Sequence, residues 1–388
     1  MEHVIIVHHH EIVLKGDNRN FFEKQLRKNI RHVLGDLIPH EAISGGYGKF
    51  VIRLNEENLT SEIILRLGYI FGLANICIGL KVKQDLQTFC TAAERLLDGI
   101  DFKTIRVHTK RPDKSFPLKS VEVNTAVGAH ICSHFNTGVD LSAPDETIRI
   151  DIVDGGAYVY RTKIPGAGGL PSGTGGRVVA LLSSGFDSPV ASWKIMRRGA
   201  SAIFIHFHSM PYTSQASLEQ VRKLVRLLTR YQFLSKLYIV PFADLQKEIV
   251  LQAPQSLRII LYRRMMLRIA DAVAHKEEAE ALVTGEAVGQ VASQTLRNIR
   301  NINSATSMPI LRPLSGTDKE ETMAVARTIG TYEISKEPYD DCCSFLAPRR
   351  PETWSDYRQI EEAESKLDIP VLIDSVMAKL EVERFSYP

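Results

Sequence analysis

One stretch of the sequence decides the fold: Arg177-Val-Val-Ala-Leu-Leu-Ser-Ser-Gly-Phe-Asp-Ser-Pro-Val-Ala191. Its apolar first half predicts a buried strand that ends at Leu182, and the short Ser/Gly turn after it leads directly into a helix. No Lys-Ser or Lys-Thr follows this turn, which excludes a Walker A motif. Taken alone, the pattern also fits a serine-capped helix after a buried strand, which occurs in any α/β protein.

The side chains of this turn suit a ligand with several phosphate oxygens. Backbone N–H groups at a helix start, with the hydroxyls of Ser183, Ser184 and Ser188, can donate several hydrogen bonds at once. Gly185 would let the backbone approach the ligand closely, because it carries no Cβ. Asp187 is an anion and cannot donate to phosphate, so we expect it to bind magnesium or to cap the helix.

Beyond this stretch the chain alternates between apolar strands and helical runs. The predicted strands are VVALL, SAIFIHF, KLYIVPF and EALVTG, which begin at residues 178, 201, 236 and 280. Such alternation is typical of a parallel, doubly wound α/β sheet, whose ligands bind at the carboxyl ends of the strands.

The segments before it predict smaller α+β units. The first unit would contain a strand over residues 4–7, a helix over 20–37 and a strand over 50–54. The second unit would contain a strand over residues 105–109, a helix over 118–132 and a hairpin around Asp154-Gly155-Gly156. The glycine- and proline-rich stretch from Ile164 to Arg177 predicts either a linker or a loop folded near the site.

The composition is that of a globular protein with two or three domains. The 388 residues are 44% hydrophobic and 24% charged, with a net charge of +3, which permits nucleic acid as a partner without demanding it. No apolar run is long enough to span a bilayer, and the start lacks the pattern of a signal peptide. The five cysteines are scattered and include no Cys-x-x-Cys, so we expect a cytoplasmic protein with reduced thiols and no zinc ribbon.

Several motifs resemble one family. SSGFDS is similar to the SGGxDS pyrophosphate loop of the adenylating PP-loop ATPases, with Ser184 in place of the second glycine. EIVLKGDNRNFFE, VHTKRPDKSFP, VTGEAVGQVASQTLRNI and EPYDDCCSFLAPRRPET resemble, in this order, segments of the tRNA uridine 4-sulfurtransferases, or 4-thiouridine synthetases. His9 and His10 stand where that family usually has an aromatic residue and a glycine.

The resemblance implies a domain plan. It comprises a ferredoxin-like domain over residues 1–60, a THUMP RNA-binding domain over 61–165, a linker over 166–176, and a PP-loop ATP pyrophosphatase domain over 177–388. The last would have the adenine nucleotide alpha hydrolase-like fold, with ATP and Mg²⁺ as cofactors. The implied activity is adenylation of a tRNA uridine at O4, followed by sulfur transfer to give 4-thiouridine. A further role in supplying sulfur to the thiamine thiazole is also implied.

The resemblance also implies which residues contact ATP. They are Leu181, Leu182, Ser183, Ser184, Gly185, Phe186, Asp187, Ser188, His206, Phe207, Arg263, Gly285 and Gln294. Without the resemblance, Arg263 or Arg264 could equally be a solvated helix charge and His206 an interior histidine that packs in the core.

Cys342 and Cys343 are the candidate sulfur carriers. A thiolate in a polar loop can carry persulfide sulfur or attack an activated base. Asp340 and Asp341 would raise the pKa of these thiols, while Arg349 and Arg350 could compensate. The sequence does not distinguish between the two cysteines, and Asp187 is the third candidate catalytic residue. The sulfur would come from a cysteine desulfurase persulfide or from sulfide.

Basic residues cluster between Phe102 and Lys119 and, beside the VHTKRPDKSFP motif, predict contacts with the tRNA backbone. They are Lys103, Arg106, Lys110, Arg111, Lys114 and Lys119. The resemblance also implies a possible homodimer. Two other functions stay open at this point: a PP-loop enzyme that adenylates a small molecule, and an RNA-binding protein with a degenerate nucleotide site.

Overall fold

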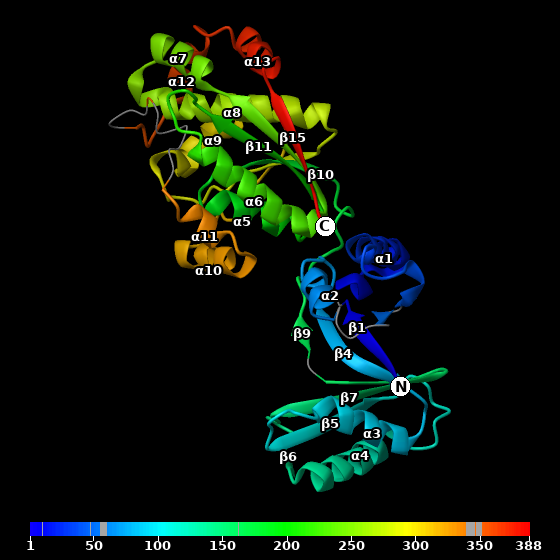
Figure 1. Cartoon of the computed structure of the whole chain (residues 1–388). Helices are drawn as coiled ribbons and strands as arrows, with labels where there is room; N and C mark the ends of the chain where they lie inside the picture. Colours follow the sequence, from blue (N-terminus) through cyan, green and yellow to red (C-terminus); the bar gives the residue numbers. More distant parts are fainter. Residues whose placement is uncertain (10, 47, 55–59, 162, 339–345, 347–350) are drawn as a thin grey trace. The chain divides into compact units, whose positions relative to one another are not determined.

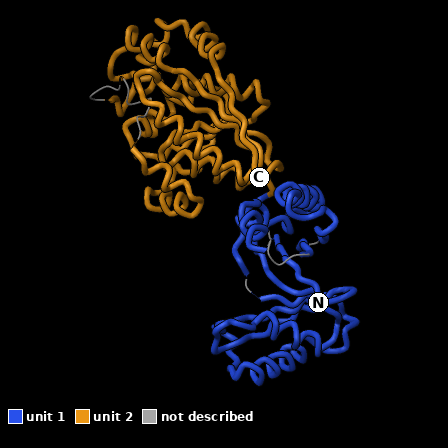
Figure 2. The backbone as a smooth tube through the Cα atoms, in the orientation of Figure 1, with its two compact units in different colours: residues 1–170 blue, residues 171–388 orange. Residues whose placement is uncertain are grey.

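The chain folds into two compact units, Met1–Leu170 and Pro171–Pro388 (Figure 2). The computed structural model describes residues 1–388 except 10, 47, 55–59, 162, 339–345 and 347–350. The division between the units falls inside the stretch predicted as a linker.

The second unit contains the predicted parallel sheet (Figure 1). Its strands lie in the order β14-β13-β10-β11-β12-β15, and all neighbouring pairs are parallel except β12 and β15. The strands are β10 (Arg177–Leu181), β11 (Ser201–His208), β12 (Leu234–Pro241), β13 (Ala281–Val283), β14 (Ile310–Leu311) and β15 (Glu381–Ser386). The predicted α/β class is confirmed. The antiparallel edge strand β15 was not predicted.

Helices cover both faces of this sheet. They are α5 (Asp187–Met196), α6 (Ala216–Gln232), α7 (Ala243–Gln252), α8 (Arg258–Lys276), α9 (Leu296–Asn303), α10 (Lys319–Ile329), α11 (Tyr332–Ser335), α12 (Tyr357–Glu364) and α13 (Ile369–Met377). In Figure 1, α8 lies on one side of the sheet and α5 and α6 on the other. The apolar side of α8, including Tyr262, Met265 and Ile269, is fully buried against Val179 and Ile205 of the sheet.

The sheet changes direction between β10 and β13. From β10 the chain crosses to β11 on one side, whereas β13 pairs with β10 on the other, with Ala180 opposite Val283. The loops that leave these two strands therefore diverge and open a crevice at their carboxyl ends, where ligands of doubly wound sheets bind.

The glycine-rich stretch packs far from that crevice. The backbone N–H groups of Gly173, Thr174 and Gly175 all donate to the carbonyl of Gly199, at 2.9 to 3.0 Å. Gly199 precedes β11, at the amino end of the sheet. The alternative of a loop folded near the site is therefore wrong for residues 173–175, because Gly199, with a φ of +91°, holds them at the opposite edge.

The first unit is built on one continuous sheet. Its order is β2-β3-β1-β4-β8-β7-β5-β6, and β9 also pairs with β4. The strands are β1 (Glu2–His8), β2 (Ile43–Gly46), β3 (Lys49–Arg53), β4 (Asn75–Val82), β5 (Thr104–Lys110), β6 (Gly138–Val139), β7 (Glu146–Val153), β8 (Gly156–Tyr160) and β9 (Ile164–Pro165). The pairing of β4 with β8 joins the two predicted α+β parts into one unit.

In the described part of the first unit the α-helices beside this sheet are α1 (Arg19–Leu34), α2 (Thr60–Leu67), α3 (Leu86–Leu97) and α4 (Ser120–Phe135). The helix predicted over 118–132 thus begins two residues later, because Lys119 is its N-cap and the Glu122 carboxylate accepts from the Lys119 N–H at 2.6 Å. Helices α3 and α4 bury Ile105, Ile148 and other apolar residues of one sheet face. Among the described residues, no helix is long and apolar enough to cross a membrane.

The opposite face of this sheet is concave. Lys49 of β3 and Asp151 of β7 form an ion pair of 3.0 Å, although β1, β4 and β8 lie between their strands. Only a strongly curled sheet brings them together. Val4, Ile6 and Cys77 fill the hollow, so Cys77 packs in the core.

Candidate active site

A cavity of about 320 Å³ opens at the carboxyl ends of β10, β11 and β13. Twelve of the thirteen predicted ATP-contact residues line it: Leu181, Leu182, Ser183, Ser184, Gly185, Asp187, Ser188, His206, Phe207, Arg263, Gly285 and Gln294. Phe186 does not line it, because its ring packs against Tyr332 of α11, 5.3 Å away between centroids. The structure thus gathers segments that lie more than one hundred residues apart. Whether these residues contact ATP stays a prediction.

The turn after β10 is organised by its own hydroxyls. The Ser188 Oγ accepts from the Ser183 N–H at 2.9 Å and donates to the Ser183 carbonyl at 3.2 Å. The Ser183 Oγ in turn lies 3.1 Å from the Ser188 Oγ and 3.4 Å from the Gly185 N. These bonds fold the turn over the first residues of α5, so that it faces the cavity with hydroxyls and N–H groups.

Ser184 fits the turn without strain. Its φ is not positive, unlike that of Asn136, Phe233, Glu278 and Leu346 among the described residues other than glycine. The side chain is fully buried, and its Oγ lies 3.2 Å from the Ser217 Oγ of α6. A serine in place of the usual glycine therefore ties the turn to α6, and it does not force an unfavourable backbone conformation.

Gly285 allows β13 to approach α5. A Cβ at this position would lie 2.6 Å from the Ser188 N and 2.8 Å from the Asp187 carbonyl carbon. Both are backbone atoms of the first turn of α5, so they could not move aside as a flexible side chain could. The close contact of these two segments therefore requires glycine.

A buried carboxylate that the sequence analysis missed holds Arg263. Glu286 is 5% exposed, and its oxygens accept from the Arg263 Nη1 and the Arg312 Nε, each at 2.7 Å, and from the Thr284 hydroxyl at 3.0 Å. Burial alone would raise the pKa of Glu286, but the charges of Arg263 and Arg312 outweigh it and lower the pKa. One anion thus faces two cations, which leaves a net positive charge beside the cavity.

Asp187 is the first residue of α5, and it is not the N-cap. Its carboxylate accepts from the Lys319 Nζ at 2.8 Å and from the Gln290 Nε2 at 3.0 Å. The capping role considered for Asp187 is therefore not what the structure shows. Its position beside the turn leaves the magnesium role as a prediction.

Three further predicted residues differ in what they offer to the cavity. The Nδ1–H of His206 donates to the Leu182 carbonyl at 2.9 Å, which ties β11 to the end of β10. The ring of Phe207 packs in the core against Phe242. Gln294 is 8% exposed, and its Oε1 accepts no hydrogen bond from another described residue. An amide oxygen in that condition can accept from a ligand.

Cys342 and Cys343 lie outside the described residues, but the chain on either side of them is held near the cavity. Before them, the Ser335 Oγ donates to the Gly185 carbonyl at 3.4 Å. After them, the Thr353 carbonyl accepts from the Thr295 Oγ1 at 2.9 Å, next to Gln294. Both anchor points therefore adjoin residues that line the cavity.

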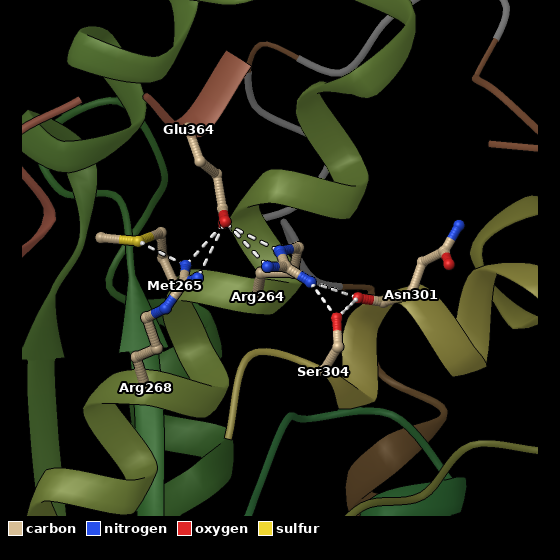
Figure 3. A network of polar contacts seen from close by, with 6 residues as sticks. All are labelled: Arg264, Met265, Arg268, Asn301, Ser304 and Glu364. Carbon is tan, nitrogen blue, oxygen red and sulfur yellow. Dashed lines mark hydrogen bonds and ion pairs between the residues drawn. The ribbon is translucent and has the colours of Figure 1, made fainter. Parts of the chain in front are cut away.

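A buried ion-pair network holds the chain beyond these cysteines (Figure 3). Glu364 of α12 accepts from Arg264 at 2.7 and 2.8 Å and from Arg268 at 2.6 and 2.8 Å, and Arg264 also donates to Ser304. Burial would raise the pKa of Glu364, but the two arginines lower it to about 2. Arg264 is thus structural, whereas Arg263, one residue earlier on α8, turns toward the cavity.

The six basic residues predicted to bind RNA do not form one cluster. Lys103 precedes β5 and Arg106 lies in its first half, where its Nη1 donates to the Leu141 carbonyl at 3.0 Å. Lys110, Arg111, Lys114 and Lys119 follow at the other end, and the Arg111 guanidinium donates to the carbonyls of Leu118 and Lys114. A strand of this length separates its two ends by roughly 20 Å. Their contacts with RNA stay a prediction.

Comparison with known proteins gives matches along the whole chain. A model of the ThiI ferredoxin-like domain matches residues 4–77, a THUMP model matches 83–161, and a model described as thiamine biosynthesis protein (ThiI) matches 173–369. A probable tRNA sulfurtransferase of Thermoanaerobacter sp. is 41% identical, over 97% of this chain and 98% of the relative. Another probable tRNA sulfurtransferase, of Thermus thermophilus, is 39% identical over 100% of this chain and 95% of the relative.

A solved structure agrees with these matches. The crystal structure of a 4-thiouridine synthetase–RNA complex with bound ATP is similar with a TM-score of 0.90 and 37% identity. The similarity covers 99% of this chain and 100% of that chain.

Proposed function

The chain belongs to the family of tRNA sulfurtransferases, or 4-thiouridine synthetases, and from this premise we propose that its second unit binds ATP, adenylates a tRNA uridine at O4 and replaces that oxygen with sulfur. The family resemblance that the motifs indicated is thereby confirmed. One observation carries the proposal: the hydroxyl-rich turn and Arg263 line one cavity, and both anchors of the cysteine segment adjoin residues that line it. The small-molecule enzyme and the degenerate RNA-binding protein are set aside.

ATP suits the groups that line this cavity. The turn from Ser183 to Ser188 offers hydroxyls and N–H groups at the start of α5, which fit the phosphates. The Gln294 Oε1, buried and without a partner among the described residues, can accept from the adenine amino group. Magnesium usually binds phosphate oxygens together with one or two carboxylates, and Asp187 would supply one carboxylate here. When bound, the ion would neutralise phosphate charge.

Adenylation gives the base a leaving group. The uridine O4 would attack the α-phosphorus of ATP, and pyrophosphate would depart with the charge of the broken bond. Donors at the turn and the Arg263 guanidinium face the developing charge from fixed positions. Glu286 keeps Arg263 in place without neutralising it fully, because Arg312 shares the same carboxylate.

Sulfur would then attack C4 and expel AMP. Sulfide can do so directly, whereas a persulfide on Cys342 or Cys343 would first join its outer sulfur to C4. That route leaves a disulfide between base and enzyme, which a second thiol must reduce. The position of the two anchors beside the cavity supports a cysteine from this segment as the persulfide carrier or as the second thiol.

The partners of the reaction form the remaining part of the proposal. The tRNA would contact the basic residues of the first unit, and the reaction would take place in the cytoplasm. The sulfur would come from a cysteine desulfurase persulfide or from sulfide. The family model's description as a thiamine biosynthesis protein supports a second use of the sulfur. We expect a homodimer on family grounds.

The test is mass spectrometry of tRNA nucleosides after incubation with ATP, magnesium and a sulfide source. We expect 4-thiouridine and one pyrophosphate per modified base, and neither product without ATP. Formation of 4-thiouridine without pyrophosphate would contradict the adenylation step. If Cys342→Ser and Cys343→Ser each gave wild-type yields with a persulfide donor, as did the double variant, the cysteine step would be wrong.

A further inference from the structure

A tryptophan beside the candidate active site is exposed. Trp354 is 68% exposed, whereas Trp193, the other of the chain's two tryptophans, is 9% exposed. Tryptophan is usually well buried, and on a surface it is enriched where another molecule binds. Trp354 follows Thr353, whose carbonyl accepts from the Thr295 hydroxyl at 2.9 Å. Since Gln294, the residue before Thr295, lines the cavity, the indole is attached at the cavity's edge.

The indole of Trp354 is held in place on both sides along the chain. Before it, the Glu352 carbonyl accepts from the Asn298 side-chain amide at 2.8 Å. After it, the Ser355 carbonyl accepts from the Arg297 Nε at 2.8 Å. The Arg297 guanidinium also lies over the indole, 5.0 Å from the ring centroid, where a cation attracts an aromatic ring. A side chain that is ordered beforehand loses little conformational entropy when it binds a ligand.

Two more exposed apolar residues belong to the segment that holds this tryptophan. Val291 lines the cavity and is 50% exposed, and Leu296, the first residue of α9, is 71% exposed. We call Val291, Leu296 and Trp354 the apolar rim. The turn after β10, which lines the same cavity, offers hydroxyls and N–H groups instead. A nucleic acid base has apolar faces and a polar edge, so it suits a site where an apolar rim adjoins a polar cavity.

We propose that Trp354 positions the target uridine by stacking on its base after that base has left the stack of the tRNA. The inference rests on the proposed function, which supplies the uridine as substrate. Enzymes that act on a base turn it out of its stack, and a new stack on an aromatic side chain offsets the loss. Trp354 directly follows one anchor of the segment that carries Cys342 and Cys343. A base stacked on it would therefore lie beside both the cavity and that segment.

Tryptophan fluorescence tests the stack without any chemistry. The full-length protein is titrated with tRNA in the presence of an ATP analogue that cannot be cleaved after the α-phosphate, and the anisotropy of labelled tRNA reports binding separately. Bound tRNA should quench the emission of the wild type, because a stacked base quenches an indole. It should not quench that of Trp354→Phe, whose remaining tryptophan, Trp193, is buried.

A tRNA with an abasic residue in place of the uridine that mass spectrometry shows to be modified identifies the stacked base. It should bind but not quench. Equal quenching by the abasic tRNA, or bound tRNA without quenching, would overturn the inference. Quenching by the ATP analogue alone would overturn it as well, because the indole would then contact adenine.

Substitution of Trp354 tests whether the stack serves the reaction. Loss of one base–aromatic stack weakens binding roughly 5- to 150-fold, so Trp354→Ala should lower kcat/KM for tRNA in 4-thiouridine formation roughly tenfold or more. Trp354→Phe keeps a ring and should retain most of the activity, whereas Trp354→Leu keeps only apolar surface and should not. Leu234→Ala is the matched control, because Leu234 is 67% exposed and begins β12 at the amino end of the sheet. Its kcat/KM should equal that of the wild type.

The Kd for ATP and the Tm separate stacking from folding. Both should change little in all variants, because the substituted side chains are exposed. Equal activity of Trp354→Leu and Trp354→Phe would overturn the inference. So would a loss in Trp354→Ala that follows a fall in Tm, since the ring would then serve only to hold the chain. A wild type that forms no 4-thiouridine would contradict the proposed function and the inference with it, whereas modification without quenching contradicts the inference alone.

Discussion

Replacing Gly285 with alanine tests whether the approach of β13 to α5 positions the turn that we propose binds the phosphates of ATP. The added Cβ would lie 2.6 Å from the Ser188 N, so the start of α5 would have to retreat by roughly 0.8 Å to reach the 3.4 Å of an ordinary contact. Displacements of about 1 Å in a catalytic site cost roughly 100-fold in rate. We therefore expect kcat/KM for ATP to fall by about two orders of magnitude.

The assay is tRNA-dependent release of pyrophosphate, together with thermal unfolding. Overpacking of this kind costs about 1–3 kcal/mol of stability, so the variant should still fold at 25 °C. Gly316→Ala is the control, because its Cβ would meet no atom within 4 Å and its φ is not positive. A Gly285→Ala enzyme with kcat/KM within twofold of the wild type would refute the argument. So would a Gly316→Ala enzyme with the same loss.

Three other changes test the neighbouring contacts. Arg263→Lys should raise the Kd for ATP about tenfold in calorimetry, because one charge-assisted hydrogen bond is lost while Glu286 stays paired with Arg312. Unchanged affinity would show that Arg263 does not contact ATP. Ser188→Ala should cost about 1 kcal/mol in urea unfolding and weaken ATP binding, whereas Ser192→Ala, one turn further along α5, should affect stability alone. The low pKa of Glu364 contributes stability above its ordinary pKa of 4.5, and this is lost as pH falls toward 2. Urea unfolding of the wild type should therefore lose up to about 3 kcal/mol over that range, and Glu364→Gln should depend less on pH.

The sequence predicted the cavity because its main determinants are local. A strand, a serine-glycine turn and a helix follow one another between Arg177 and Ala191, and the alternation of strands beyond them places further loops at the same edge. The identities of His206, Arg263 and Gln294 came from family resemblance. Nothing in the residues themselves distinguished Arg263 from Arg264. Their roles depend on the direction in which each side chain projects from α8.

The partners of those residues could not be predicted in the same way. Glu286 lies directly after Gly285, but its pairing with Arg312 depends on β13 and β14 being neighbours, which is a tertiary property. The same holds for Asp187 and Lys319, which are 132 residues apart. The basic run from Lys103 to Lys119 appeared as one patch because sequence proximity hides the length of β5.

The arrangement of α8 and α9 suggests how the proposed adenylation and sulfur transfer would share one site. An adenylated base is exposed to water, so the sulfur must reach C4 without the base leaving the cavity. Arg263 of α8 lines that cavity, and Arg264 of the same helix binds Glu364, beyond the cysteine segment. Helix α9 begins beside Gln294, and its Asn298 accepts from the Ser355 hydroxyl at 2.7 Å. The elements that shape the cavity are therefore the same ones that hold the far end of the segment carrying Cys342 and Cys343. A change that loosened this attachment, such as Asn298→Ala, should slow sulfur transfer more than pyrophosphate release. Equal loss of both steps would show that the attachment serves folding alone.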